Sequence, residues 1–324
     1  MAMQVGIVLP IGQEDGMIAA PAYGEVRAVA IEAETVGLDS VWVYDHLLFR
    51  FDGETTGIHE CWTVLSAIAE ATSRVRLGTI VMATSFRNPA LLAKMAATLD
   101  HISDGRLILG LGCGWHDPEY EAFGYPTDHK VGRFEESLAV ILGLIRDGGA
   151  DLDGRWVQAT DAVLIPPARR EMPILIAAKR PRMLELTARH ADAWNAAWFG
   201  LPDERLATLR GDLAAACDRV GRDPSTIGIT VGVNVRYDDL LRPSGAFESQ
   251  PSTAAALTGT TAEIAAGIAA HAAAGTSHLI VALEPTIPES VRRLREAVDV
   301  ARVGGGSAAG PPEGGTAGAT VRTG

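Results

Sequence analysis

Short apolar runs rich in β-branched residues alternate along the chain with longer segments whose apolar residues recur at helical spacing. This alternation predicts parallel strands joined by helices that cover them. Eight strands are expected, at residues 4–9, 40–44, 76–82, 106–111, 174–178, 193–197, 227–235 and 277–282.

A helix is expected after each strand, and several of these helices open with proline or with a hydroxyl residue that can cap the first turn. Their expected ranges are 23–36, 62–72, 89–102, 133–146, 181–189, 202–220, 261–274 and 288–301. Eight strand and helix units in this order predict an α/β fold, a (β/α)8 TIM barrel that occupies residues 1–303.

Three segments depart from this pattern. Between the fourth helix and the fifth strand, residues 152–165 are expected to form a short β-hairpin insertion, because Asp153 and Gly154 make a turn dipeptide flanked by apolar residues. Residues 240–252 have little periodicity, which predicts a loop after the seventh strand. Residues 304–324 are mainly Gly, Ala, Pro and Thr, so we expect a disordered tail.

Composition narrows the class of partner. The 324 residues are 47% hydrophobic, enough for one large core, and the net charge is −12. Such an acidic chain is a poor partner for nucleic acid or an anionic membrane, so a small organic molecule is expected. Without a signal sequence or a membrane-spanning run, the chain is expected to be cytoplasmic. Its three cysteines are spaced for neither a disulfide framework nor a metal site.

Chemistry is expected at the C-terminal ends of the strands, where the active sites of such barrels lie. Asp45 and His46 follow the second strand and place an acid and an imidazole there. The two side chains fit a group that handles protons, and a capped loop would also explain them.

Glycines alternate at the end of the fourth strand and just after it, at Gly110, Gly112 and Gly114, and let the backbone approach another group closely. Trp115 adds a flat surface, so a planar ring would fit this space, although glycines at a barrel corner would also explain the run. The run is not a dinucleotide-binding motif, because Trp115 stands where the third glycine should be. We interpret Cys113 as a packing residue and not a nucleophile.

A basic cluster follows Ala177 and Ala178 at the end of the fifth strand. Lys179, Arg180 and Arg182 stand at the start of a helix, where free N–H groups and the helix dipole favour anions. A phosphate site is therefore expected, with a solvated basic loop as the alternative.

Aromatic residues around the sixth strand suggest a pocket. Trp194 is interpreted as a packing residue and Trp198 as part of a substrate pocket. His59 and Glu60 precede the second helix, where they line the mouth or cap that helix.

In this order, the segments resemble the luciferase-like monooxygenase superfamily, and especially its branch of oxidoreductases that use the deazaflavin coenzyme F420. The resemblance covers residues 3–302 and is most specific over residues 37–46, 76–89 and 102–112. It implies an enzyme whose cofactor lies at the C-terminal mouth of the barrel. Members commonly dimerise through barrel helices, so a homodimer is also implied.

The resemblance also implies roles for single residues. Ile80 and Val81 occupy the place of a non-prolyl cis peptide under the central ring of the cofactor. His46 is the implied catalytic residue, which handles a proton beside the reactive ring carbon, and Asp45 is implied to contact the ring system. The loops at Gly112, Cys113 and Gly114 and at Ala177, Ala178, Lys179 and Arg180 are implied to hold the cofactor's ribityl and phosphate parts.

The chain differs from the F420-dependent glucose-6-phosphate dehydrogenases of this superfamily. Trp115 stands where they carry a catalytic glutamate, and their sugar-phosphate lysine falls near Gly200. With Trp115 and Trp198 in the pocket, a larger and weakly charged substrate is expected.

Three functions remain in competition. The leading one is hydride transfer between coenzyme F420 and an organic substrate, in either direction. The second is a reduced-FMN-dependent monooxygenase of the bacterial luciferase type. The third is a barrel subunit without catalysis, since a fold does not guarantee a function.

Overall fold

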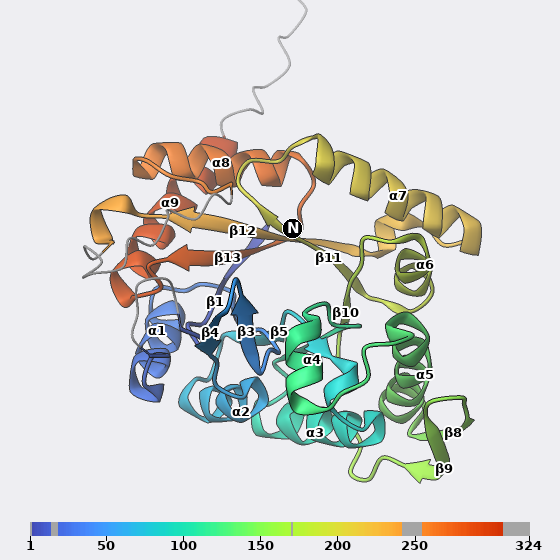
Figure 1. The fold of residues 1–324 in the computed structure, drawn as a ribbon. Helices are drawn as coiled ribbons and strands as arrows, with labels where there is room; N and C mark the ends of the chain where they lie inside the picture. Colours follow the sequence, from blue (N-terminus) through green and yellow to red (C-terminus); the bar gives the residue numbers. More distant parts are fainter. Residues whose placement is uncertain (1, 14–18, 170, 242–254, 307–324) are drawn as a thin grey trace, which may run out of the picture.

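Eight parallel strands close into a barrel in the computed structural model, which describes residues 2–13, 19–169, 171–241 and 255–306. The last strand pairs with the first, with Gln4 opposite His278, and this pairing closes the sheet (Figure 1). The predicted TIM barrel is confirmed. Its strands, in spatial order, are β1 (Gln4–Val8), β2 (Ser40–Val43), β5 (Arg76–Thr79), β7 (Leu107–Gly112), β10 (Ile174–Ala177), β11 (Ala193–Phe199), β12 (Gly228–Arg236) and β13 (His278–Glu284).

Helices surround the barrel, and several of them open with proline or with a capping side chain, as expected (Figure 1). The Asn88 side chain accepts hydrogen bonds from the N–H groups of Ala90 and Leu91 at 3.0 and 3.1 Å, and Pro89 opens the helix. These contacts satisfy N–H groups that have no partner inside the helix. The helices are α1 (Tyr23–Thr35), α2 (Cys61–Ala71), α3 (Pro89–Ile102), α4 (Asp117–Phe123), α5 (Lys130–Leu142), α6 (Pro181–His190), α7 (Glu204–Val220), α8 (Thr261–Ala273) and α9 (Pro288–Gly306), with single turns at η1 (Thr84–Phe86), η2 (Gly143–Asp147), η3 (Pro224–Thr226) and η4 (Asp238–Leu240).

Side chains fill the inside of the barrel, so it is not a pore. The indole of Trp42 is fully buried there, and a Cβ added at Gly78 would lie 2.1 Å from it. Glycine at that position therefore makes room for the largest side chain of the interior. The other buried residues of this cluster are Val8, Ile108, Leu175 and Ile280.

A polar group lies beneath Trp42, at the N-terminal ends of the strands. The indole Nε1 donates to the hydroxyl of Ser40 at 2.7 Å, and that oxygen lies 2.7 Å from Nε2 of His278. Burial lowers the pKa of His278 to about 3, so the imidazole is neutral. At this end of the barrel we assign the group to stability and not to catalysis.

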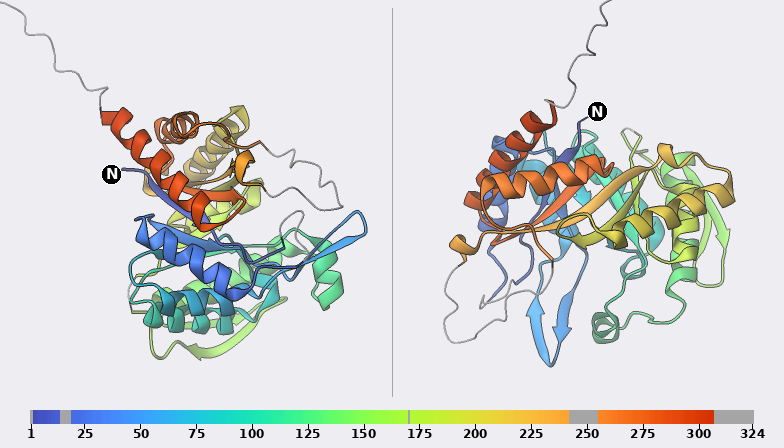
Figure 2. Two further views of the ribbon diagram at one scale, coloured as in Figure 1. Left: turned by 90° about the vertical axis from the view of Figure 1, so that its left-hand side faces the viewer. Right: turned by 90° about the horizontal axis from the view of Figure 1, so that it is seen from above.

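The structure differs from the expected pattern at three places. The third strand is interrupted after β5 and resumes as β6 (Met82–Ala83), which pairs with β7. The expected hairpin insertion is confirmed as β8 (Gly149–Asp153) and β9 (Gln158–Val163). A second hairpin, β3 (Leu48–Phe51) with β4 (Glu54–Gly57), and the short helix α4 were not expected. The β3–β4 hairpin projects from the barrel on the side of the strand C-termini (Figure 2).

The expected tail and one expected loop lie largely outside the described residues. Helix α9 ends at Gly306, three residues beyond the expected end of the barrel, and residues 307–324 are not described. Of the loop expected at 240–252, residues 242–252 are likewise not described.

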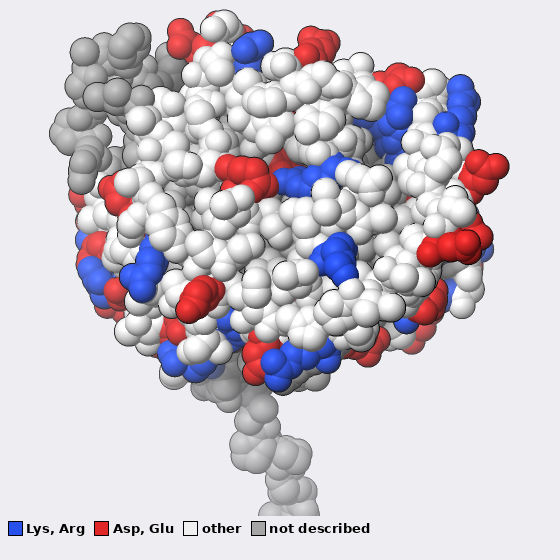
Figure 3. Space-filling model, turned by 90° about the horizontal axis from the view of Figure 1, so that it is seen from below, with Lys and Arg blue, Asp and Glu red and all other residues white. Residues whose placement is uncertain are grey.

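Charged side chains are interspersed on the face that α2 and α3 cover, seen from below in Figure 1 (Figure 3). Basic residues form no continuous surface on this face. Among the described residues, every helix is too short or too polar to cross a membrane.

Candidate active site

The residues singled out in the sequence meet at the C-terminal mouth of the barrel. His46 follows β2, Val81 follows β5, Trp115 follows β7, and Lys179 follows β10. Contacts link these neighbours: the rings of His46 and Trp115 lie 5.5 Å apart, and the Lys179 amine donates to the carbonyl of Ala197 at 2.9 Å. The barrel thus brings segments from four strands into one site.

A buried glutamate holds His46. Oε1 of Glu119 lies 2.8 Å from Nδ1 of His46, and Oε2 accepts from the N–H of Leu47 at 2.8 Å. An ionised carboxylate only accepts hydrogen bonds, so Nδ1 carries a hydrogen in this pair. Glu119 is 1% exposed, while the His46 side chain is 13% exposed. The pair fixes the ring orientation and leaves Nε2 as the atom available for proton transfer.

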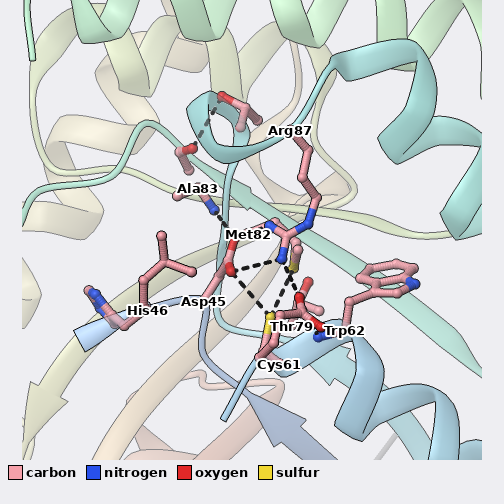
Figure 4. Close-up of polar contacts among 12 residues, drawn as sticks. Asp45, His46, Cys61, Trp62, Thr79, Met82, Ala83 and Arg87 are labelled. Carbon is pink, nitrogen blue, oxygen red and sulfur yellow. Dashed lines mark hydrogen bonds and ion pairs between the residues drawn. The ribbon is translucent and has the colours of Figure 1, made fainter. Parts of the chain in front are cut away.

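Asp45 points away from His46, into a buried ion pair (Figure 4). Its Oδ2 accepts from Arg87 at 2.6 Å and from the N–H of Ala83 at 3.0 Å, and its Oδ1 accepts from the thiol of Cys61 at 3.3 Å. Asp45 is 4% exposed. Its carboxylate therefore holds the segment after β5 against the end of β2.

Arg87 supplies the positive charge among the acidic groups of this network. It also pairs with Glu60 at 2.5 Å, so two carboxylates and the thiol of Cys61 surround one guanidinium. Burial and the charge of Asp45 raise the pKa of Cys61 well above its usual value, so the thiol stays protonated. The cluster has ligand types that a metal could use, but the Arg87 guanidinium already lies between the two carboxylates and offsets one of their two negative charges.

The alternating glycines at the end of β7 and just after it are required by contacts inside the protein. A Cβ at Gly110 would lie 1.8 Å from the carbonyl oxygen of Thr79, and one at Gly112 would lie 2.5 Å from the Val81 side chain. Gly114 has a φ of +72°, and its Cβ would lie 1.7 Å from the hydroxyl of Tyr120. Close packing at a barrel corner, the alternative to a ligand site, thus explains all three glycines.

Two non-prolyl cis peptides lie at the mouth. The one between Ile80 and Val81 is at the place that the resemblance implies, and the one between Ala197 and Trp198 was not expected. In both cases the second residue packs on a glycine of the next strand: Val81 on Gly112, and Trp198 on Gly232, whose Cβ would lie 2.7 Å from the indole. These glycines let both side chains reach the mouth.

The three basic residues after β10 have different surroundings in the structure and do not form one cluster. Arg182 forms an ion pair with Glu135 on α5, and Lys179 is held by the Ala197 carbonyl. Burial lowers the pKa of Lys179. Arg180 stands at the N-cap of α6, and its guanidinium makes no ion pair with another described residue. An anion at this helix start would meet Arg180 first.

Aromatic and thiol residues take the expected kinds of position. Trp194 is fully buried and donates to the carbonyl of Ala178 at 2.8 Å, which is a packing role, whereas Trp198 is 38% exposed. Burial raises the pKa of Cys113, which is consistent with a packing residue. Glu60 caps α2, and His59 bonds the carbonyl of Pro21.

Three features of the site were not expected from the sequence: Glu119, the Arg87 ion pair and the aromatic residues of the β3–β4 hairpin. Glu119 stands within the first turn of α4, after Asp117 and Pro118, which together form a readable helix start. His116, which precedes this helix, is 3% exposed, and its Nε2 accepts from the N–H of Arg50 at 3.0 Å. Burial lowers the pKa of His116, so this ring is neutral and anchors the β3–β4 hairpin.

Comparison with known proteins identifies relatives. The family model "Luciferase-like monooxygenase" matches residues 3–240. A phthiodiolone/phenolphthiodiolone dimycocerosates ketoreductase of Mycobacterium sp. (strain JLS) is 38% identical over 240 residues, 67% of this chain and 63% of the relative. The pyrimidine monooxygenase RutA of Methylobacterium radiotolerans is 31% identical over 254 residues, 74% of this chain and 66% of the relative. The chain thus spans less than two thirds of the length of these relatives.

Solved structures share the fold. An F420-dependent secondary alcohol dehydrogenase in complex with an F420-acetone adduct superposes with a TM-score of 0.75 at 20% identity, covering 93% of this chain and 100% of that one. A riboflavin lyase with modified FMN and riboflavin gives 0.74 at 15% identity, covering 94% and 92%. The expectation of an oxidoreductase or monooxygenase enzyme is confirmed by the named relatives. This chain belongs to the luciferase-like monooxygenase family.

Proposed function

We propose that the enzyme binds coenzyme F420 at the barrel mouth and transfers a hydride between it and a weakly charged ketone or secondary alcohol. A ketoreductase among the relatives and an alcohol dehydrogenase with the same fold support this substrate group. The observation that carries the proposal is the His46 and Glu119 pair, which lies beside an apolar floor at the mouth.

The floor fits the planar ring of a deazaflavin. Ile80, Val81 and Ala282 are partly buried above the packed interior of the barrel and offer an apolar surface. Trp198 stands to one side of this floor, where the small Gly232 makes room for it. An apolar floor excludes water from one face of a bound ring, which favours hydride transfer over side reactions.

We assign to His46 the transfer of the proton that accompanies the hydride. Coenzyme F420, when bound, supplies or accepts the hydride. During ketone reduction, His46 donates the proton on Nε2 to the carbonyl oxygen, and during alcohol oxidation it accepts that proton back. The Glu119 carboxylate stabilises the charged imidazolium and keeps a hydrogen on Nδ1 throughout.

Arg180 and the N-terminus of α6 are assigned to the phosphate of the cofactor. The helix start offers N–H groups and a favourable dipole, and Arg180 adds a charge that no described acidic side chain neutralises. Lys179 and the backbone of Ala177 and Ala178 line the approach to this position. The loop from Gly112 to Gly114 is assigned to the ribityl chain through its backbone.

A reduced-FMN-dependent monooxygenase is the second candidate. RutA, at 31% identity, is named a monooxygenase, and the same anion site would suit a flavin monophosphate. The apolar surface of Ile80, Val81 and Ala282 suits the ring of either cofactor. The test therefore compares the binding of F420 with the binding of FMN.

Titration of the purified protein with F420 and with FMN, followed by fluorescence and absorbance, separates the candidates. We expect saturable F420 binding, weakened about tenfold in Arg180→Ala because a charged hydrogen bond to phosphate contributes about 1.5 kcal/mol or more. Arg182→Ala is the matched control, since its guanidinium is paired with Glu135, and should bind F420 as the wild type does. Tight FMN binding without F420 binding would refute the proposal.

The activity of the His46→Ala variant is the second test of the proposed function. F420 affinity should change less than twofold, while turnover of a reducible ketone should fall by roughly a hundredfold, the contribution of a positioned proton donor. Unchanged turnover would remove His46 from the mechanism.

A further inference from the structure

Three aromatic side chains form one surface beside His46, which we call the aromatic wall: Phe49 and Phe51 on the β3–β4 hairpin, and Trp115 after β7. The ring of Phe49 lies 4.4 Å from the imidazole of His46, and the ring of Trp115 lies 5.5 Å from it. Phe51 stacks on Trp115 with ring centroids 6.3 Å apart. The wall therefore begins at the proposed proton donor and continues along β3, in the hairpin that projects from the barrel in Figure 2.

The outer half of the wall is exposed to solvent. Phe51 is 53% exposed and Trp115 is 62% exposed, which is unfavourable for large apolar rings in water. Packing of the barrel does not require either ring, because both lie beyond the strand ends. A ligand that covers them would recover this apolar surface.

The ring planes favour a flat ligand. Phe49 and Phe51 are inclined by 27°, Phe51 and Trp115 by 21°, and Phe49 and Trp115 by 32°. Faces with similar orientations suit stacking with a planar ring, whereas a flexible alkyl chain needs no common plane. The bond from Arg50 to His116 ties the hairpin to α4, so the wall is held before a ligand arrives.

We propose that the aromatic wall binds a planar, uncharged ring system of the substrate and holds it against His46. The assignment rests on the proposed function for the reaction at His46, but not for binding at the wall. It makes Phe49, Phe51 and Trp115 the residues that determine specificity, and it places the bulk of the substrate outside the barrel along the β3–β4 hairpin.

Calorimetric titration of the cofactor-free protein with two uncharged ten-carbon ketones tests the wall. The probes are 1-tetralone, which carries a planar aromatic ring, and 2-decanone, which is a flexible chain. We expect 1-tetralone to bind about tenfold more tightly, because an aromatic pair adds roughly two- to tenfold in affinity beyond the buried area. Equal affinity for the two ketones would overturn the assignment to a planar ligand.

Phe51→Leu keeps an apolar side chain but removes the ring. It should weaken 1-tetralone binding about fivefold and change 2-decanone binding less than twofold. Phe123→Leu on α4 is the matched control, because Phe123 is also 53% exposed but lies outside the wall, and it should bind both ketones as the wild type does. Circular dichroism establishes that each variant is folded.

Two results would refute the wall as a substrate surface. One is unchanged 1-tetralone binding in both Phe51→Leu and Trp115→Leu. The other is a change of oligomeric state in these variants, measured by light scattering, with 1-tetralone binding intact, which would make the wall an interface between copies of the chain. Because these titrations need no cofactor, failure to bind F420 would count against the proposed function and leave the wall standing.

Discussion

Glu119→Gln tests the pair at the centre of the proposed mechanism. The amide oxygen keeps the bond from the N–H of Leu47, so the NH2 group then faces Nδ1 of His46. An NH2 group donates, which favours the tautomer of His46 with its hydrogen on Nε2 and none on Nδ1. The neutral amide also no longer stabilises the imidazolium. The substitution therefore reverses the tautomer while nearly keeping the shape of the site.

The expected loss in kcat is about a hundredfold, or about 3 kcal/mol in the activation free energy, because a positioned proton donor contributes at least this much. Two charge-assisted hydrogen bonds become neutral ones, which should lower the free energy of unfolding by roughly 1 kcal/mol each. The affinity for F420 should stay within twofold, because Glu119 is 1% exposed and does not line the mouth.

Oxidation of reduced F420 by 1-tetralone, followed by absorbance, is the assay. Because the neutral amide no longer stabilises the imidazolium of His46, Glu119→Gln should be about a hundredfold slower than the wild type. Glu121→Gln, an exposed glutamate on the same helix, is the control and should behave as the wild type. A Glu119→Gln enzyme with the rate of Glu121→Gln would show that the pair has no part in proton transfer.

Two further predictions concern stability. Arg87→Ala leaves the buried Asp45 carboxylate without its cation and should lower the free energy of unfolding by about 3 to 5 kcal/mol. Arg182→Ala removes only an exposed ion pair and should cost less than about 1 kcal/mol in urea unfolding, so equal losses would contradict the buried role of Arg87. His278 has a folded pKa of about 3, below the unfolded value, so the unfolded chain takes up a proton first as pH falls. Stability should therefore decrease below about pH 6.5, by about 2 kcal/mol at pH 5, and His278→Gln should flatten this dependence.

Much of the fold follows from local patterns in the sequence. Strand and helix periods depend on neighbours a few residues apart, and helix starts depend on single caps such as Asn88 and Pro89. These signals predicted all eight barrel strands and placed His46, Val81 and Lys179 at strand ends. The short β3–β4 hairpin escaped because its exposed, four-residue strands lack a buried face that would impose an alternating pattern.

The site depends on partners that lie far apart in the chain. Glu119 meets His46 across 73 positions, and Arg87 meets Asp45 across 42. Neither pairing has a local signature, because each depends on how a loop leaves one strand and returns over another. The alternating glycines show the same division. Their spacing revealed a close approach, but only the structure showed that Gly112 approaches Val81 of its own chain.

The sequence by itself therefore determined the barrel, the end at which chemistry occurs and the residue types available there. The tertiary structure decided which nitrogen of His46 is held, where Asp45 points and which aromatic rings stand together. The physical reason is the separation along the chain of the residues that interact. Periodicity and capping involve residues a few positions apart, whereas contacts at the mouth join distant segments that the closed barrel and its loops bring together.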